Sequence, residues 1–193
     1  MIKLSRPQCP NQEALRTNYK HPDNKAVLIL ASHDKCMYCE SKVSHTYYGD
    51  IEHIKPKSKF PGLEFDWGNL GYVCARCNGY KSDKYDEANP ILNPYDEDPE
   101  THIVVLGAFF AHKDNSTKGK ITIEEQSGVH LNRPALIERR QDRINLLKKV
   151  IGACAKLEDS AKEAVLESIK PEAEEDKEYS LCVKALLKTE GID

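Results

Sequence analysis

Two Cys-x-x-Cys pairs, Cys36/Cys39 and Cys74/Cys77, bracket a segment that carries the residue types needed to hydrolyse a phosphodiester. A Cys-x-x-Cys turn brings two thiolates close together, so two such turns supply four soft ligands for one tetrahedral Zn²⁺. Four protein ligands close the coordination shell, and we therefore expect a structural zinc site. The 34 residues that separate the pairs must return to their starting point, which constrains the fold between them.

Two disulfides or a thioredoxin-like redox pair are the alternatives for these cysteines. Residues 1–10 contain no apolar segment typical of a signal peptide, so we expect a cytoplasmic protein whose thiols stay reduced. A redox pair also needs no second copy, which favours zinc. The remaining cysteines, Cys9, Cys154 and Cys182, stand alone, and we expect buried thiols without an assigned role.

Hydrolysis of a phosphodiester needs a base that deprotonates water and a cation that neutralises charge on the phosphorus. His53 is the candidate base, because the unperturbed pKa of histidine is about 6.5. Glu52 and Asp50 offer hard oxygen ligands suited to Mg²⁺ or Mn²⁺, and the Asn78 amide oxygen offers another. Asn78 is also a residue type favoured at helix N-caps, so a structural role stays open.

Basic side chains surround these candidates along the sequence. They are Lys55, Lys57, Lys59, Arg76, Lys81 and Lys84. Either a solvated face or contact with phosphates explains such a run, and phosphate contact would position a nucleic acid without reading its bases. His33 and His45 lie near the first cysteine pair, but four thiolates complete a zinc shell, so we expect these histidines at the surface.

The elements that must position these residues are predicted as strand, loop, strand and helix. A strand over residues 47–54 ends at Lys55-Pro56, because proline cannot donate to a ladder. Residues 57–68 form a loop, residues 70–73 form the return strand, and a helix runs from Cys77-Asn78 to about Glu87. This order is a ββα unit.

Helices are expected on both sides of that unit. Upstream, one runs over residues 22–34 with Ala26, Val27, Leu30 and Ala31 on one face, and a shorter one lies over 12–19. Downstream, residues 103–110 and 120–123 favour a hairpin with its turn at 115–119. Pro134 then opens a long helix whose apolar positions are Leu136, Ile144, Leu147, Ile151, Cys154 and Leu157, and further helices lie over 161–169 and 173–187.

Charge is distributed unevenly over a chain whose net charge is −3. Residues 1–25 carry +3, residues 26–90 carry −1 and residues 91–193 carry −5. A stand-alone DNA binder is usually basic, so nucleic-acid affinity must come from a local patch or a partner. No apolar run approaches the ~18 residues of a membrane-spanning helix. We divide the chain into a basic segment (1–25), a zinc-stapled core (26–88) and an extension (89–193) that either stabilises the core as an autonomous bundle or docks a partner.

These motifs resemble the HNH, or ββα-metal, endonucleases. His53 matches the first His of that family, Asn69 matches the middle Asn, and Asn78 stands where the final His is usual, as in the HNN branch. The resemblance implies that His53 is the general base, that Asn69 holds the loop in register, and that Glu52 joins Asn78 at the catalytic metal. Many relatives have Asp at the position of Glu52, so Asp50 remains an alternative ligand.

Further motifs extend the resemblance over roughly residues 26–140. They include Cys36-Met37-Tyr38-Cys39-Glu40, Cys74-Ala75-Arg76-Cys77-Asn78-Gly79-Tyr80-Lys81, Leu92-Asn93-Pro94-Tyr95 and Leu131-Asn132-Arg133-Pro134. The combination is similar to a subgroup that contains the retron-associated HNH nucleases and the nuclease subunits of the Septu anti-phage system. It implies a bacterial defence nuclease that works with an ATPase partner.

The sequence thus predicts an α+β protein with a zinc-stapled ββα-metal HNH core, N-terminal helices and a mainly helical C-terminal extension. The predicted activity is DNA cleavage by water that His53 activates, with structural Zn²⁺ and catalytic Mg²⁺ or Mn²⁺. A zinc-ribbon module that binds nucleic acid or protein without turnover is the alternative, favoured by Asn78, Glu52 and the acidic balance. An RNA-directed nuclease is a third reading, because activated water attacks either backbone.

Overall fold

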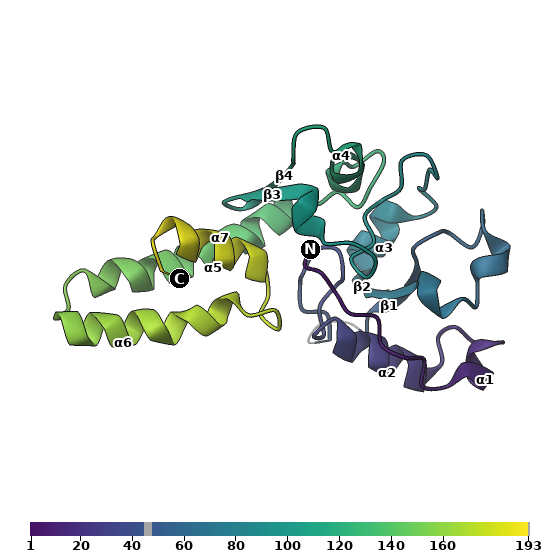
Figure 1. The fold of residues 1–193 in the computed structure, drawn as a ribbon, viewed down its shortest axis with the longest axis horizontal. Helices are drawn as coiled ribbons and strands as arrows, with labels where there is room; N and C mark the ends of the chain where they lie inside the picture. The colour runs from purple at the N-terminus through teal and green to yellow at the C-terminus, as the bar shows by residue number, and fades with distance from the viewer. Residues whose placement is uncertain (45–47, 193) are drawn as a thin grey trace.

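The computed structural model describes residues 1–44 and 48–192, and its elements lie along an elongated molecule (Figure 1). The helices are α1 (Gln12–Leu15), α2 (Pro22–Ala31), α3 (Ala75–Lys81), α4 (Thr117–Ile123), α5 (Pro134–Cys154), α6 (Asp159–Ile169) and α7 (Ser180–Thr189). The strands are β1 (Asp50–His53), β2 (Leu70–Val73), β3 (Ile103–Leu106) and β4 (Phe109–His112). Short 3-10 helices are η1 (Pro61–Leu63), η2 (Trp67–Asn69), η3 (Pro99–Thr101) and η4 (Lys170–Ala173). The strands pair as β1–β2 and β3–β4, which confirms the predicted α+β class.

The hairpin β1–β2 and helix α3 form the predicted ββα unit. The strands pair antiparallel, with His53 opposite Leu70. The predicted first strand started at Tyr47, which lies outside the described residues. Gly71 lets the first Cys-x-x-Cys turn lie against β2, because a Cβ at this position would come within 2.2 Å of the Met37 sulfur. The zinc turn and the hairpin are therefore packed directly together.

Helix α3 begins and ends earlier than the predicted helix from Cys77 to Glu87. The Cys74 sulfur accepts a hydrogen bond from the Cys77 amide at 3.4 Å and so caps the first turn. Ser82, with a φ of +48°, leaves the right-handed helical region and ends the helix. Asn78 consequently lies inside α3, and its interpretation as a helix N-cap is wrong.

Helix α2 buries a different face from the one predicted. Leu30, which belongs to the predicted packed face, is 75% exposed, whereas Leu28 and Asn24 are fully buried. The side chain of Asn24 exchanges two hydrogen bonds of 3.0 Å with the backbone of Asn11, which is also the N-cap of α1. A polar anchor therefore sets the rotation of α2, and apolar periodicity does not report such an anchor.

The two strands of the hairpin downstream of the core lie closer together in the sequence than predicted. β3 pairs with β4 across a turn at Gly107, whose φ is +61°, and residues 117–123 form helix α4 instead of a strand. The Ser116 hydroxyl caps α4 by accepting a hydrogen bond from the Gly119 amide at 3.0 Å. Gly119 also packs tightly, because a Cβ there would lie 2.4 Å from the His102 carbonyl oxygen. Capping and close packing thus override the local alternation that favoured a strand.

Helices α5, α6 and α7 form the predicted helical extension at one end of the molecule (Figure 1). α5 starts at Pro134 as predicted, and its buried apolar residues are Leu136, Ile144, Leu147 and Cys154. Leu157 lies beyond the end of α5 and is 43% exposed. The last helix starts at Ser180 instead of Ala173, because the 3-10 helix η4 ends at Ala173 and residues 174–179 form turns and bends.

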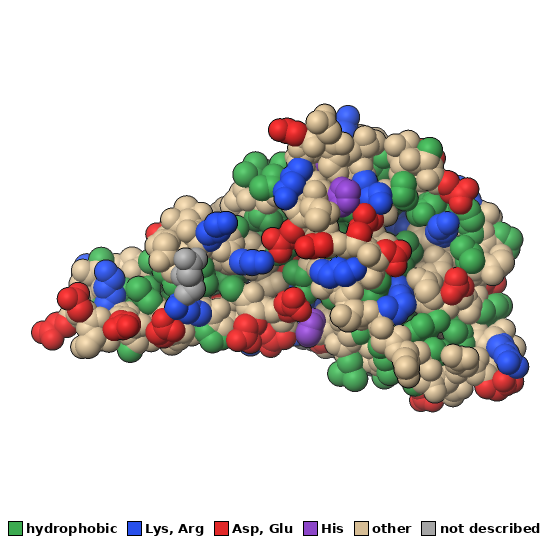
Figure 2. All heavy atoms as spheres, viewed as in Figure 1, with side chains coloured by type: hydrophobic (Ala, Val, Ile, Leu, Met, Phe, Trp, Pro, Cys, Tyr) green, Lys and Arg blue, Asp and Glu red, His purple; other side chains and the backbone are tan. Residues whose placement is uncertain are grey.

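The exposed surface of this extension is rich in acidic side chains. Figure 2 shows carboxylates along the face that carries α6, in keeping with the charge of −5 on residues 91–193. No helix in the described part of the chain is both long and apolar enough to traverse a bilayer.

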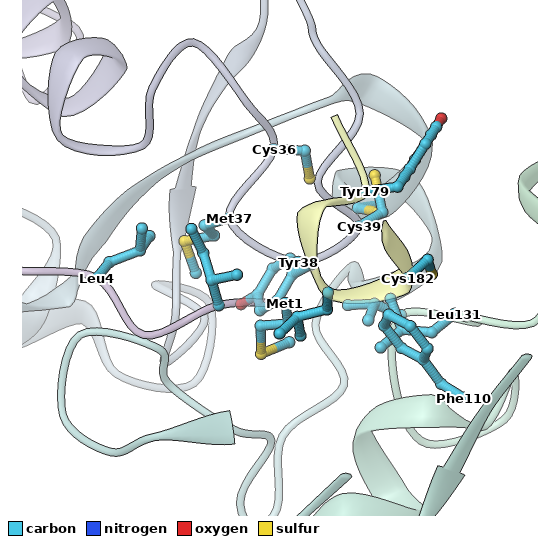
Figure 3. Close-up of a cluster of buried hydrophobic side chains, with 14 of the residues drawn as sticks. Met1, Leu4, Cys36, Met37, Tyr38, Cys39, Phe110, Leu131, Tyr179 and Cys182 are labelled. Atoms are coloured by element: carbon cyan, nitrogen blue, oxygen red, sulfur yellow. The ribbon is translucent and has the colours of Figure 1, made fainter. Parts of the chain in front are cut away.

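The extension packs on the first Cys-x-x-Cys turn. The buried carboxylate of Glu40 accepts a hydrogen bond from the Ser180 hydroxyl at 2.8 Å, and the Lys42 amide donates to Glu178 at 2.6 Å. Figure 3 shows side chains of the N-terminal segment, this turn, β4 and α7 meeting around Tyr38 in one buried cluster. The core thus continues from the zinc turn into the extension.

Asn69 holds the long connection between β1 and β2. Its Oδ1 accepts a hydrogen bond from the Lys55 amide at 2.7 Å. Its Nδ2 donates to the carbonyl oxygens of Lys55 at 2.9 Å and Leu63 at 3.2 Å. These contacts fix the register of the loop that follows the strand with His53.

We expect Asn69→Ala to lower the free energy of unfolding by about 2–4 kcal/mol, because it leaves buried backbone groups without partners. Denaturant titration measures this loss, and hydrogen exchange at the Lys55 amide should accelerate. Asn145→Ala on the exposed face of α5 is the matched control and should stay within about 0.5 kcal/mol of the parent. Equal stability of the two variants would contradict the role of Asn69.

Candidate active site and zinc site

The four cysteines of the two Cys-x-x-Cys turns come together at one point. Their sulfur atoms all lie within 4.8 Å of one another, and the Cys39 and Cys74 sulfurs are 3.8 Å apart. A tetrahedral Zn²⁺ with Zn–S bonds of about 2.3 Å requires sulfur separations of about 3.8 Å. The cluster therefore fits a four-thiolate zinc ion. Of the isolated cysteines, Cys154 and Cys182 are buried as expected, whereas Cys9 is half-buried.

Arg133 from the extension reaches this cluster. Its guanidinium donates a hydrogen bond to the Cys77 sulfur at 3.5 Å and others to the carbonyl oxygens of Val129 and His130. Four thiolates around Zn²⁺ leave a net charge of −2, and a buried cation offsets part of it. Sequence reasoning assigned Arg133 no role, although it lies in the Leu131-Asn132-Arg133-Pro134 motif.

A cleft of about 320 Å³ lies beside the ββα unit. Its lining residues are Tyr19, Lys20, Asp50, Ile51, Glu52, His53, Pro56, Lys57, Ser58, Asn78, Ser82 and Asp83. It gathers all of β1, Asn78 of α3 and the two residues that follow this helix, so the candidate base and the candidate hard ligands share one cavity. Asn69 does not line the cleft, which agrees with a supporting role.

His53 is held with one defined ring nitrogen available. Its Nε2 lies 2.9 Å from the carbonyl oxygen of Glu64. A carbonyl only accepts hydrogen bonds, so Nε2 carries the proton and Nδ1 carries the lone pair of the neutral imidazole. Burial lowers the pKa of His53, although the bond to Glu64 acts in the opposite direction. Burial thus favours the neutral ring, and the bond to Glu64 leaves Nδ1 as the nitrogen that can accept a proton.

Glu52 and Lys81 form a buried pair beneath His53. Their side chains are almost fully buried, and the Lys81 ammonium lies 2.5 Å from Glu52 Oε1. This contact is not an aligned hydrogen bond, since Oε1 has no such partner, and the ammonium instead donates to the His53 carbonyl oxygen at 2.8 Å. Burial raises the pKa of Glu52 to about 7, against the opposing charge of Lys81. Lys81 is therefore an internal cation, and its predicted contact with nucleic acid is wrong because no part of it reaches the surface.

Asp50 and Asn78 face each other at the more open part of the cleft. The Asn78 amide donates to Asp50 Oδ2 at 3.1 Å. Asp50 and Glu52 are two positions apart on β1 and therefore project from the same face of the strand. Asn78 and Lys81 are three positions apart on α3 and therefore lie on the same face of the helix. Two polar contacts thus cross from β1 to α3, one at Asp50–Asn78 and one at Glu52–Lys81. Apart from the cysteine cluster, no group of three His, Cys, Asp or Glu residues with ligand spacing occurs among the described residues.

The remaining predicted phosphate contacts are scattered. Lys57 lines the cleft, and Lys59 is exposed on the same loop. Lys55 lies 3.5 Å from Glu87, and the Lys84 ammonium donates to a backbone carbonyl at 2.5 Å. Arg76 is exposed but lines a separate cavity of about 390 Å³ between α3 and α5. Only part of the predicted basic set therefore surrounds the catalytic candidates.

Neither of the two histidines near the first cysteine pair is seen at the sulfur cluster in the described part of the chain. His33 is half-buried and lies 3.9 Å from Glu175, outside the sulfur cluster. His45 lies outside the described residues.

Sequence reasoning also missed Tyr19 and Lys20, which line the cleft. No motif marks either residue, and the basic charge of residues 1–25 was the one signal in this segment.

A pair of strands, a following helix, two zinc-binding turns and a histidine-bearing cleft define the HNH class of nuclease domain. Residues 36–84 match the family model described as HNH endonuclease, and the chain therefore contains an HNH endonuclease domain. The chain is 35% identical to the Septu protein PtuB of Bacillus thuringiensis, over 68% of this chain and 55% of that protein. It is 30% identical to the Septu protein PtuB of Bacillus mycoides (strain KBAB4), over 63% of this chain and 51% of that protein. The chain thus spans about half the length of these curated relatives.

We expect Arg133→Met to weaken zinc binding by about 10- to 100-fold, the usual effect of removing a partner of a metal ligand. Competition with a chromophoric chelator measures the affinity, and Arg133→Lys should retain part of it because the charge remains. Arg139→Met, on the exposed side of the same helix, is the control. Identical zinc affinity in both Met variants would show that Arg133 does not support the cluster.

Proposed function

We propose that this chain hydrolyses DNA phosphodiesters in the cleft beside β1, with His53 as the general base. The observation that carries the proposal is the hydrogen bond from His53 Nε2 to the Glu64 carbonyl oxygen, which leaves Nδ1 as the proton acceptor. A water molecule at that nitrogen would lose its proton as it attacks the phosphorus. The Tyr19 ring and the surrounding chain limit the access of bulk water to the imidazole.

A Mg²⁺ or Mn²⁺ ion would be held by the carboxylates of Asp50 and Glu52 together with the Asn78 amide oxygen. These are hard oxygen donors on facing elements, with the Asn78 and Asp50 side chains in hydrogen-bond contact and Oε1 of Glu52 held 2.5 Å from the Lys81 ammonium. When bound, such an ion neutralises charge that develops on the phosphoryl group and on the departing oxygen. Lys81 keeps the adjacent backbone of His53 in place and supplies positive charge next to the two carboxylates on this face of β1.

Substitution of the base tests the activity directly. His53→Ala should slow nicking of supercoiled plasmid in Mn²⁺ by at least about 100-fold, because proton abstraction is lost. Zinc content and thermal unfolding should match the parent. His112→Ala, an exposed histidine on β4, should cut at the parental rate, and equal cutting by both variants would remove His53 from the mechanism.

The metal assignment has a separate test that needs no turnover. Asp50→Asn and Glu52→Gln should each weaken Mn²⁺ binding by about tenfold or more in calorimetric titration, because each removes a charged ligand. Asp83→Asn changes another carboxylate of the cleft and should leave the affinity within about twofold. Unchanged affinity in Asp50→Asn would contradict the shared site and leave Glu52 as the carboxylate ligand.

We further propose that the chain acts in bacterial anti-phage defence, in the cytoplasm, with an ATPase partner. Support comes from the similarity to Septu PtuB proteins and from the docked helical extension, whose exposed acidic surface is available for contact. The proposed division remains a basic segment (1–25), the nuclease core (26–88) and a partner-docking region (89–193). Parallel assays on plasmid DNA and on structured RNA separate the DNA activity from the RNA-directed alternative, and inactivity on both favours a binding module.

A further inference from the structure

The N-terminal segment forms one wall of the catalytic cleft. Tyr19 lies edge-on to His53, with ring centroids 4.5 Å apart and an interplanar angle of 65°. Tyr19 and the adjacent Lys20 both line the cleft, although they lie 17 and 16 residues before the start of the HNH match at Cys36. The cleft is therefore incomplete without residues outside the family motif.

Two ammonium groups gather at the Tyr19 ring. The Lys57 nitrogen lies 4.8 Å and the Lys20 nitrogen 5.6 Å from the ring centroid, within the range of cation–π attraction. Lys57 is already paired with Glu64 at 2.6 Å. Lys20 has no carboxylate within ion-pair distance in the described part of the chain. Lys20 is thus an exposed ammonium without an ion-pair partner in a cleft that also holds the carboxylates of Asp50, Glu52 and Asp83.

The turn that presents Lys20 is fixed by local hydrogen bonds. The Asn18 side chain accepts from the Lys20 amide at 3.0 Å, and the Asn18 carbonyl accepts from the His21 amide at 3.2 Å. The following helix α2 is anchored through the buried Asn24 to Asn11. The N-terminal segment is also tied to the core, because the Trp67 indole donates to the Pro7 carbonyl at 2.8 Å. The position of Lys20 therefore depends on a rigid support.

We propose that Lys20, held over the Tyr19 ring, binds a backbone phosphate of the nucleic acid next to the phosphate that is cut. This inference rests on the proposed nuclease function and adds a substrate subsite to it. An ammonium group without a counter-ion on the wall of a cleft attracts phosphate, and the contact would position the strand without reading its sequence. Lys57, from the loop that follows β1, assists as a second cation at the same ring, with its charge partly neutralised by Glu64.

Binding of a fluorescein-labelled DNA duplex to the full chain carrying His53→Ala tests this subsite, because binding is then measured without cutting. Addition of Lys20→Ala should reduce the slope of log affinity against log salt by about 0.9, the contribution of one phosphate contact on duplex DNA. Tyr19→Ala should reduce the slope similarly because it removes the support of Lys20, and Tyr19→Phe should not. Zinc content and thermal unfolding verify that each variant is folded.

Arg16→Ala is the matched control, since Arg16 is an exposed cation of the same segment that pairs with Glu13 and does not line the cleft. Its salt slope should equal that of the His53→Ala parent. If Lys20→Ala behaves like Arg16→Ala while the unmodified chain still cuts DNA, the subsite is wrong and the nuclease function stands. If the unmodified chain neither binds nor cuts DNA, both proposals fail.

Discussion

Convergence of four sulfur atoms on one point is the constraint on which the rest of this structure depends. It brings together the two ends of the segment that separates the cysteine pairs. The elements β1, β2 and α3 must therefore pack within a short distance of one another. The same cluster begins helix α3, because the Cys74 sulfur caps the first turn, and α3 in turn carries Asn78 and Lys81. A small ββα unit buries little apolar surface by itself, and a Zn²⁺ ion held by these four sulfurs would add folding free energy.

The zinc cluster is also the point at which the extension joins the nuclease unit. Arg133 reaches one thiolate from the start of α5, and the residues around the start of α7 bond to the first zinc turn at Glu40 and Lys42. Loss of a Zn²⁺ ion bound at these sulfurs would consequently disturb both the β1–β2 hairpin and the docking of the helices. The HNH domain and the extension thus form a continuous folded structure joined at the metal cluster.

Charge in the cleft is arranged in two layers between β1 and α3. The deeper layer pairs Glu52 with the fully buried Lys81, which also supports the backbone of His53, while the shallower layer pairs Asp50 with Asn78. An internal ammonium limits the electrostatic repulsion between two nearby carboxylates and keeps the strand in place. The N-terminal turn covers the other side of His53 through Tyr19, so a segment that precedes the family motif also shapes the site.

Residue type and spacing alone determined the zinc ligands, the ββα order, the return strand at 70–73 and the start of α5 at Pro134. These features follow from local chemistry, because Cys-x-x-Cys turns, proline and short apolar runs act within a few residues. Tertiary structure alone decided the rotation of α2, the burial of Lys81, the position of Asn78 inside α3, and the positions of Tyr19, Lys20 and Arg133. Each of these depends on a partner far away in the sequence, and a lysine in a charged run looks the same whether it meets solvent or a buried carboxylate. Contacts between distant segments carry that information, and periodicity and composition do not.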